Sequence, residues 1–303
     1  MKKYDIIVVG AGAAGVFMSY EFAKRGINAS VLVLDKGGSL GERICPIKAG
    51  KTKTCVKCEP CHIMNGYGGA GTLSDGKYNI TTQFGGDLHN YVGVEEAMNL
   101  MEYVDEVLCN MGGADAKLYS TTNSKLKTEC LKYDLHLLEA KVRHLGTDRN
   151  VRILGKMFEY SSEKVDMQFH TVITDVNIEE DGTFTVISDK GEEYNCRDLV
   201  LATGRSGSKW ISKVCDKFGV VQKKNRVDIG VRVELPAEVF KHITDDVYES
   251  KIMYQTDKYN DLVRTFCMNP YGEVVSENTN GIVTVNGHSY DDPALHTENT
   301  NFA

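Results

Sequence analysis

Three glycines near the amino terminus have a spacing that suits the binding of a phosphate group. Gly10, Gly12 and Gly15 fit the pattern G-x-G-x-x-G, and Asp35 follows twenty residues after the last of them. In this pattern the first glycine permits a tight turn, the second lets a pyrophosphate approach the backbone, and the third lets a helix pack closely against a strand. Asp35 could accept hydrogen bonds from both ribose hydroxyls of an adenosine, and its charge would repel a 2′-phosphate. These residue types at this spacing predict a dinucleotide-binding site.

The segments around the glycines have the order of elements that such a site requires. Residues 4–9 are an apolar run rich in β-branched side chains, which predicts a strand buried on both faces. Residues 13–25 have a helical pattern that Gly26 can end, and residues 29–34 form a second apolar run that stops at Asp35. The helix dipole and the free N–H groups at the start of the helix would favour an anion. This context makes the fingerprint specific for a dinucleotide, although the motif alone does not separate FAD from NAD.

A second group of residues that could do chemistry is a set of cysteines. Cys55, Cys58 and Cys61 are separated by two residues each, and Cys45 lies upstream, directly before a proline. Thiols at this spacing can converge on one metal, and a fourth from a loop can complete the site, which predicts an iron–sulfur cluster or zinc. Two alternatives remain open at this point, a redox-active disulfide and four reduced loop thiols without a special role.

Composition and charge limit the classes of function. The 303 residues allow two domains, and 42% hydrophobic with 25% charged residues is typical of a globular protein. A net charge of −7 gives no basic surface for nucleic acid, and no apolar stretch reaches the length of a membrane span. Nine cysteines in a chain without an export signal indicate reduced thiols, metal ligands or redox groups. We therefore expect a cytoplasmic protein with a small-molecule substrate or electron donor, and with neither nucleic acid nor a membrane as partner.

The chain after Asp35 predicts one long loop, then helices and a β-rich part. Residues 36–90 hold eleven glycines and four cysteines with little apolar periodicity, and loops of this length are usually functional or disordered. Helices are predicted for residues 92–111, 206–218 and 236–243, and in part for residues 137–157. Strands are predicted for residues 165–177, 184–188, 198–202 and 227–235.

Residues 199–204 carry a second nucleotide signal. Their sequence, Leu-Val-Leu-Ala-Thr-Gly, is a short buried strand that ends at Thr203 and Gly204. It resembles the Ala-Thr-Gly segment of flavoproteins with the glutathione-reductase type of FAD domain. That resemblance implies that the terminal glycine passes the cofactor and that a small β-meander precedes the strand. Residues 165–188 fit the place of the meander, and Ile173 matches the backbone position that contacts the adenine. Both segments in this order favour FAD over NAD.

Four further segments look like one bacterial family. Residues 68–77, 144–148, 227–234 and 266–270 resemble the FAD-dependent, or NAD(FAD)-utilising, dehydrogenases, a family without an assigned reaction. The resemblance covers nearly the whole chain and implies FAD, a two-dinucleotide-type fold and redox chemistry, but no substrate. Flavoproteins of this class return late in the chain to the FAD domain with a Gly-Asp pair, whereas the only such pair here is at residues 86–87. Members of the family continue beyond residue 303, so we expect a chain that is truncated at its carboxyl terminus.

The predicted fold class is α/β, with a Rossmann-like FAD-binding domain and a β-rich second domain that is incomplete at the carboxyl terminus. The FAD-binding domain would combine a parallel sheet with the β-meander and would be discontinuous, with residues 1–90 and 140–225. Residues 91–139 would form a helical excursion, and residues 226–303 would begin the substrate domain. The predicted cofactor-binding residues are Gly10, Gly12, Ala13, Ala14, Gly15, Asp35, Lys36, Gly69, Ala70, Gly71, Ser74, Asp75, Gly76, Lys77, Ile173, Thr203 and Gly204.

His144 and Arg205 are the candidates for catalysis. A cation at a flavin face stabilises the anionic reduced flavin, and a histidine can relay protons. For either residue, a structural salt bridge or a helix cap is the alternative role. The predicted metal ligands are Cys45, Cys55, Cys58 and Cys61.

Together these features predict an FAD-dependent oxidoreductase, a dehydrogenase or reductase that transfers a hydride or electrons through the flavin. NAD(P)H is a conceivable co-substrate, but Gly66, Gly68 and Gly71 only repeat the letters of the fingerprint, because no buried strand leads into them. One alternative is an NAD(P)H-using reductase without bound flavin. The other is a non-catalytic redox sensor that binds flavin or metal.

Overall fold

The computed structural model describes residues 1–223, 227–279 and 281–303, and it divides into two compact units. The first unit consists of Met1–Thr72, Leu154–Asp228 and Ser276–Thr284. The second consists of Leu73–Ile153, Ile229–Val275 and Val285–Ala303. The predicted domain boundaries near residues 90 and 140 stay predictions, and the boundary at residues 225–226 lies outside the described residues.

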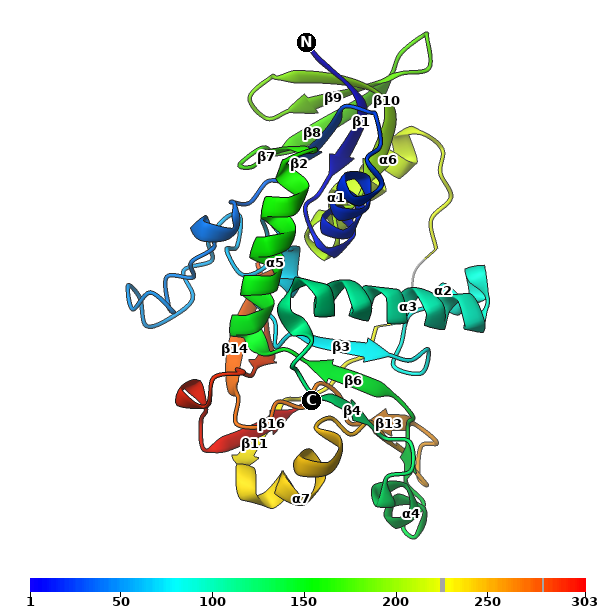
Figure 1. Cartoon of the computed structure of the whole chain (residues 1–303), viewed down its shortest axis with the longest axis vertical. Helices are drawn as coiled ribbons and strands as arrows, with labels where there is room; N and C mark the ends of the chain where they lie inside the picture. The colour runs from blue at the N-terminus through cyan, green and yellow to red at the C-terminus, as the bar shows by residue number, and fades with distance from the viewer. Residues whose placement is uncertain (224–226, 280) are drawn as a thin grey trace. The chain divides into compact units, whose positions relative to one another are not determined.

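The first unit is built around a six-stranded sheet that has the predicted nucleotide strands at its centre. The order of the strands is β7-β2-β1-β10-β9-β8, and the first four run parallel to one another (Figure 1). β1 (Lys2–Val9) pairs on one side with β2 (Val31–Leu34) and on the other with β10 (Glu193–Leu201). Because the carboxyl ends of parallel strands meet at one edge of a sheet, the turns after these three strands come together there.

The outer strands of this sheet correct one prediction. A single strand over residues 165–177 was predicted, and this is wrong, because the structure divides the segment into β7 (Asp166–Gln168) and β8 (Ile173–Ile178). The two strands lie at opposite edges of the sheet. His170, with φ of 53°, adopts a left-handed conformation that ends the extended run between them. β9 (Phe184–Ser188), where a strand was predicted, pairs antiparallel with both β8 and β10 and completes the meander.

Three helices belong wholly or partly to the first unit. α1 spans Ala13–Arg25, as predicted, and ends in Gly26, whose φ of 59° places it in the left-handed region that favours glycine. α5 (Gly146–Ser162) begins in the second unit and ends in the first. α6 (Ser208–Lys217) is fixed to the sheet because Trp210 Nε1 donates a hydrogen bond to the carbonyl of Thr174 at 3.0 Å.

The apolar core of the first unit forms against the sheet. The alternating inward side chains of β1, β2 and the meander strands are buried because each strand contributes β-branched or large apolar residues on this face. The fully buried members are Ile7, Val9, Leu32, Leu34, Ile173, Val176, Val186, Tyr194 and Cys196. This core fixes the strand ends from which the turns project.

The second unit contains small sheets instead of one large one. One sheet has the order β3-β6-β4 and another has the order β13-β12-β5, both antiparallel. The strands of these sheets are β3 (Lys77–Ile80), β4 (Leu118–Ser120), β5 (His136–Leu137), β6 (Lys141–His144), β12 (Ile252–Gln255) and β13 (Leu262–Arg264). β11 (Val233–Pro236) pairs with β16 (Asn299–Phe302). β14 (Glu273–Thr279) pairs with β15 (Ile282–His288), and these two strands are divided between the units because Ser276–Thr284 belongs to the first.

The helices of the second unit differ in detail from those predicted. The region of the predicted helix at residues 92–111 is divided at Gly93, which has φ of 86°. α2 (Leu88–Val92) precedes this glycine and α3 (Val94–Leu108) follows it. A π-helical turn at Cys109–Gly113 comes directly after α3. α4 spans Lys125–Leu131 and α7 spans Ala237–Val247.

The predicted strand at residues 227–235 forms only from Val233 onward in the described residues, because its partner β16 pairs with residues 233–236 alone. The fold class is nevertheless confirmed, as a Rossmann-like sheet that contains parallel strands with further β-rich sheets. Within the described ranges, none of the helices combines the length and the apolar character that crossing a bilayer demands.

Candidate functional site

A cavity of about 830 Å³ lies in the first unit, where the turns after β1, β2 and β10 meet. We call it the glycine groove, and its volume lies within the range of ligand pockets. Residues 64–71 and the start of α6 contribute to its walls. The predicted cofactor-binding residues that line it are Gly10, Gly12, Ala13, Ala14, Asp35, Lys36, Gly69, Ala70, Gly71, Ile173, Thr203 and Gly204.

The three fingerprint glycines have different physical reasons to be glycine. Gly10 has φ of 112°, and a Cβ there would lie 2.3 Å from the carbonyl oxygen of Ala202. A Cβ on Gly15 would lie 2.1 Å from the carbonyl oxygen of Gly10, so the fold itself excludes a side chain at both positions. Gly12 has an ordinary φ of −71°, and a Cβ there would meet no atom within 4 Å. The protein therefore places no constraint of its own on Gly12, and the missing side chain leaves free space in the groove.

The amino terminus of α1 opens into the same space. Gly12 is the N-cap residue, no side chain caps the helix, and the first turn contains no acidic residue. The N–H groups of the first turn lack partners within a helix, and the helix dipole adds positive potential there. An anionic group in the groove beside Gly12, Ala13 and Ala14 would satisfy these donors.

The carboxylate of Asp35, which lines the glycine groove, is hydrogen-bonded to three backbone segments. Its Oδ2 accepts a hydrogen bond from the N–H of Ala11 at 2.8 Å. Its Oδ1 accepts from the N–H groups of Gly37 at 2.8 Å and Gly66 at 3.0 Å. A carboxylate offers about four acceptor positions. Within the described part of the chain these three hydrogen bonds occupy three of them, so one acceptor position is left on Oδ2. The predicted bonds to both ribose hydroxyls stay a prediction, and the carboxylate has room for only one of them.

The loop that carries residues 64–71 is held by a buried arginine. Arg43 is 4% exposed, and its guanidinium donates to the carbonyl oxygens of His62 at 3.1 Å, Tyr67 at 2.7 Å and Ile63. Burial lowers the pKa of Arg43 to about 10, which leaves the side chain charged at neutral pH. The N–H of Gly68 then donates to the carbonyl of Ala11 at 2.7 Å, so the loop is joined directly to the glycine turn.

Arg205, a predicted catalytic candidate, lies in the wall after β10. It lines the groove, but its side chain is 69% exposed and lies 3.8 Å from the carboxylate of Glu277. Lys36, which also lines the groove, donates to the carbonyl of Ser206, the residue after Arg205, at 3.3 Å. The groove therefore has two basic side chains in its wall, where they could meet an anionic ligand.

Gly15 and residues 74–77 are predicted cofactor-binding residues that do not line the groove. Gly15 packs against Gly10, and Ser74, Asp75, Gly76 and Lys77 belong to the second unit. There the Lys77 ammonium contacts the carboxylates of Asp75 at 2.9 Å and Glu249, and donates to the carbonyl of Met268 at 2.7 Å. Burial alone would lower the pKa of Lys77, but the two carboxylates more than offset it and raise the pKa well above its usual value.

His144, the other catalytic candidate, belongs to a hydrogen-bonded triangle in the second unit. Its Nε2 lies 2.6 Å from the hydroxyl of Tyr248 and 2.9 Å from that of Ser289, and the two hydroxyls are 3.0 Å apart. The rings of His144 and Tyr248 stack at 4.1 Å. Burial lowers the pKa of His144 to about 4 and raises that of Tyr248, so at neutral pH the imidazole is uncharged and can accept a hydrogen bond from either hydroxyl.

Several residues of these sites escaped the sequence analysis. Met64 and Asn65 line the groove directly before the glycines at 66, 68, 69 and 71, so their position in the long glycine-rich loop was the available signal. Trp210 and Tyr248 carried no local signal, because only the tertiary fold brings α6 to the groove and the end of α7 to His144.

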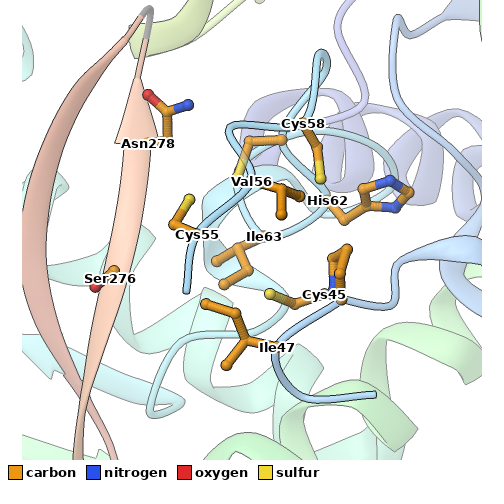
Figure 2. A pocket seen from close by; sticks show the side chains of 11 residues that line it. Cys45, Ile47, Cys55, Val56, Cys58, His62, Ile63, Ser276 and Asn278 are labelled. Carbon is orange, nitrogen blue, oxygen red and sulfur yellow. The ribbon is translucent and has the colours of Figure 1, made fainter. Parts of the chain in front are cut away.

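The four predicted metal ligands line one small cavity in the first unit. Cys45, Cys55, Cys58 and Cys61 surround about 20 Å³, together with His62 and the apolar Pro46, Ile47, Val56 and Ile63. Figure 2 shows Cys45 on one chain segment and Cys55 and Cys58 on another, around this common space. All four are free thiols. In the described part of the chain, no three His, Cys, Asp or Glu side chains are arranged as they stand to hold a metal ion.

Comparison with known families identifies the nucleotide part of the chain. The model of a family described as an NAD(P)-binding Rossmann-like domain matches residues 8–69, which include the glycine fingerprint and Asp35. The match agrees with the parallel strands of the sheet and covers less than half of the chain. A search of curated proteins finds no match.

Among solved structures, glycine oxidase from Geobacillus kaustophilus is 14% identical with a TM-score of 0.41, and the match covers 72% of this chain and 59% of that one. L-α-glycerophosphate oxidase from Mycoplasma pneumoniae, solved with FAD bound, is 13% identical with a TM-score of 0.40 and coverages of 70% and 57%. A variant of NikD, an unusual amino acid oxidase, is 13% identical with a TM-score of 0.42, and the match covers 98% of this chain and 73% of that one. The chain thus spans less than two thirds of the length of the first two. Similarities of this size do not identify a ligand or a reaction.

Proposed function

We propose that the chain binds FAD in the glycine groove and acts as an FAD-dependent oxidoreductase on a small-molecule substrate. The observation that carries this proposal is the open space beside Gly12. Its backbone conformation suits any residue and its Cβ would meet no protein atom, yet it is a glycine beside the free amino terminus of α1. Room for a pyrophosphate accounts for its lack of a side chain, which the fold does not require.

The proposed role of each wall follows from its chemistry. The N–H groups of Gly12, Ala13 and Ala14 bind the pyrophosphate. Asp35 accepts a hydrogen bond from one ribose hydroxyl at the acceptor position that remains on its Oδ2. Ile173, on the meander strand β8, matches the backbone position that contacts the adenine in the resembled flavoproteins, and it lines the groove. Bound FAD would supply a flavin that accepts or donates a hydride or electrons.

In the second unit, we assign to His144 the orientation of two hydroxyl groups. Its uncharged ring can accept a hydrogen bond from the hydroxyl of Tyr248 or of Ser289, which lie at hydrogen-bond distance. The pKa of about 4 keeps the imidazole uncharged at neutral pH, so the ring stays a hydrogen-bond acceptor. NAD(P)H remains a proposed electron donor for the flavin.

A reductase that binds NAD(P) in the groove and holds no flavin is the second candidate. The description of the matching family model, an NAD(P)-binding domain, favours it. The meander that supplies Ile173 and the Thr203-Gly204 turn favours FAD, because both line the same groove as the fingerprint.

The test is the cofactor content of the purified chain. We expect flavin absorption bands, and FAD rather than FMN after acid release, at close to one per chain. Gly12→Val should remove the flavin because its side chain would fill the groove, whereas Gly41→Val serves as the matched control. Gly41 also has open space around its Cβ but does not line the groove. A colourless wild type that binds NAD(P) tightly, or a folded Gly12→Val protein with full FAD content, would contradict the proposal.

A further inference from the structure

The segment at residues 44–62 has no apolar core of its own. The structure gives it neither a helix nor a strand, and its large apolar side chains stay partly exposed. Ile44 is 59% exposed, Val56 is 53% exposed and Ile47 is 37% exposed. Burial of apolar surface is the main source of stability for such a short segment, so a segment without it needs another kind of cross-link.

The four half-buried thiols of this segment face a common cavity, which they share with Ile47 and Val56. The segment's four cysteines line this cavity, which we call the cysteine pocket, although sixteen residues separate the first from the last. The pocket holds about 20 Å³, room for one occupant of the size of a water molecule. A cube of four iron and four sulfide ions is several times larger, so the pocket suits a single ion.

The charge of the segment suits a negatively charged centre. Residues 42–62 contain five basic side chains against two acidic ones, a net charge of +3 in a chain whose total is −7. One Zn²⁺ with four thiolates carries a net charge of −2.

We propose that the cysteine pocket binds one zinc ion through four thiolates, and that this ion fixes the fold of residues 44–62. The ligands are Cys45, Cys55, Cys58 and Cys61. A cysteine side chain has a single torsion, so each Sγ can change its position by rotation among the staggered conformations. Zinc accepts this arrangement because it prefers tetrahedral sulfur ligands and has no redox chemistry of its own.

His62 lines the pocket without being a ligand in this proposal. Its Nδ1 lies 3.2 Å from the carbonyl oxygen of Glu42, which orients the ring from outside the set of thiols. His62 therefore provides a variant that changes the pocket wall and leaves all four ligands in place.

The experiment measures metal in the full-length chain, purified under anaerobic conditions and without chelators. We expect about one zinc ion per chain with no sulfide, as four thiolates predict. Co²⁺ exchanged into the site should show the visible absorption of tetrahedral cobalt. Cys58→Ser and Cys45→Ser should each lose most of the metal. His62→Ala should keep it, as should Cys215→Ser, which changes a half-buried thiol of α6 outside the pocket.

Three results would overturn the proposal, and each can be read on the wild type even if a variant fails to fold. Iron with sulfide would indicate a cluster. A metal-free chain with two thiols fewer than expected on titration would indicate a disulfide. A metal-free chain in which all four thiols react with the titrating reagent would indicate four reduced thiols that bind no metal and form no disulfide. The flavin content is a separate reading, so failure of the zinc site and failure of the FAD proposal are distinguishable.

Discussion

Replacing Asp35 by alanine should affect both the stability of the first unit and its affinity for FAD. The carboxylate accepts three backbone hydrogen bonds, from the N–H groups of Ala11, Gly37 and Gly66. A hydrogen bond to a charged group contributes about 1.5–3 kcal/mol, and water can replace part of it because Asp35 is half-buried. We therefore expect the free energy of unfolding of the apoprotein to fall by about 3 kcal/mol. For a unit of this size, that loss lowers Tm by roughly 6–12 °C.

The affinity for FAD should fall through the one acceptor position that remains on Oδ2. Loss of a single hydrogen bond from a ribose hydroxyl to this carboxylate would raise Kd by roughly ten- to a hundredfold. FMN lacks the adenosine, so its binding should change much less. The assay is titration of the apoprotein with each flavin, combined with thermal unfolding of the same sample.

Asp5→Ala is the control, because its carboxylate also accepts hydrogen bonds, from the N–H and hydroxyl of Ser30, but does not line the groove. An unchanged Tm for Asp35→Ala apoprotein would refute the role of this carboxylate in holding the loops. An unchanged Kd for FAD in the folded variant would mean that the adenosine lies elsewhere.

Two further predictions concern the second unit. Because burial lowers the pKa of His144 from 6.5 to about 4, the unfolded chain binds one more proton between these values, so stability is full above pH 6.5 and is lost as the pH falls toward 4. His144→Gln should reduce this dependence, on the order of 3 kcal/mol, in unfolding curves measured across that range, and an identical slope would contradict the assignment. Lys77→Met leaves the buried carboxylates of Asp75 and Glu249 without their shared cation, and should cost about 3–5 kcal/mol in urea unfolding. An unchanged urea midpoint would show that the carboxylates are neutralised in another way.

The sequence was informative where a local pattern is enough. The strand, the glycine turn and the helix at residues 13–25 follow from spacing and periodicity within one short segment, and the structure has them where predicted. That residues 201–204 lie at the same groove was anticipated from their resemblance to the Ala-Thr-Gly segment of flavoproteins, which implies that the terminal glycine passes the cofactor.

The sequence was uninformative where distant segments decide the outcome. Residues 165–177 have the composition of one strand, but the turn at His170 divides them between the two edges of the sheet. The three donors to Asp35 come from turns and a loop whose conformations are set by packing. Tyr248 meets His144 through a backbone with φ of 60°, a conformation that no periodicity predicts for tyrosine.

The position of β10 in the central sheet has a consequence for synthesis on the ribosome. β1 lies between β2 and β10, and Lys2 pairs with Tyr194, so these partners are separated by almost two thirds of the chain. At a translation rate of 5–20 residues per second, roughly 10–40 s pass between the appearance of the two strands. During this time one edge of β1, with the apolar Ile7, Val8 and Val9, has no partner in the sheet. The nascent chain therefore presents an open strand to chaperones, and to aggregation with other nascent chains, until β10 has been synthesised.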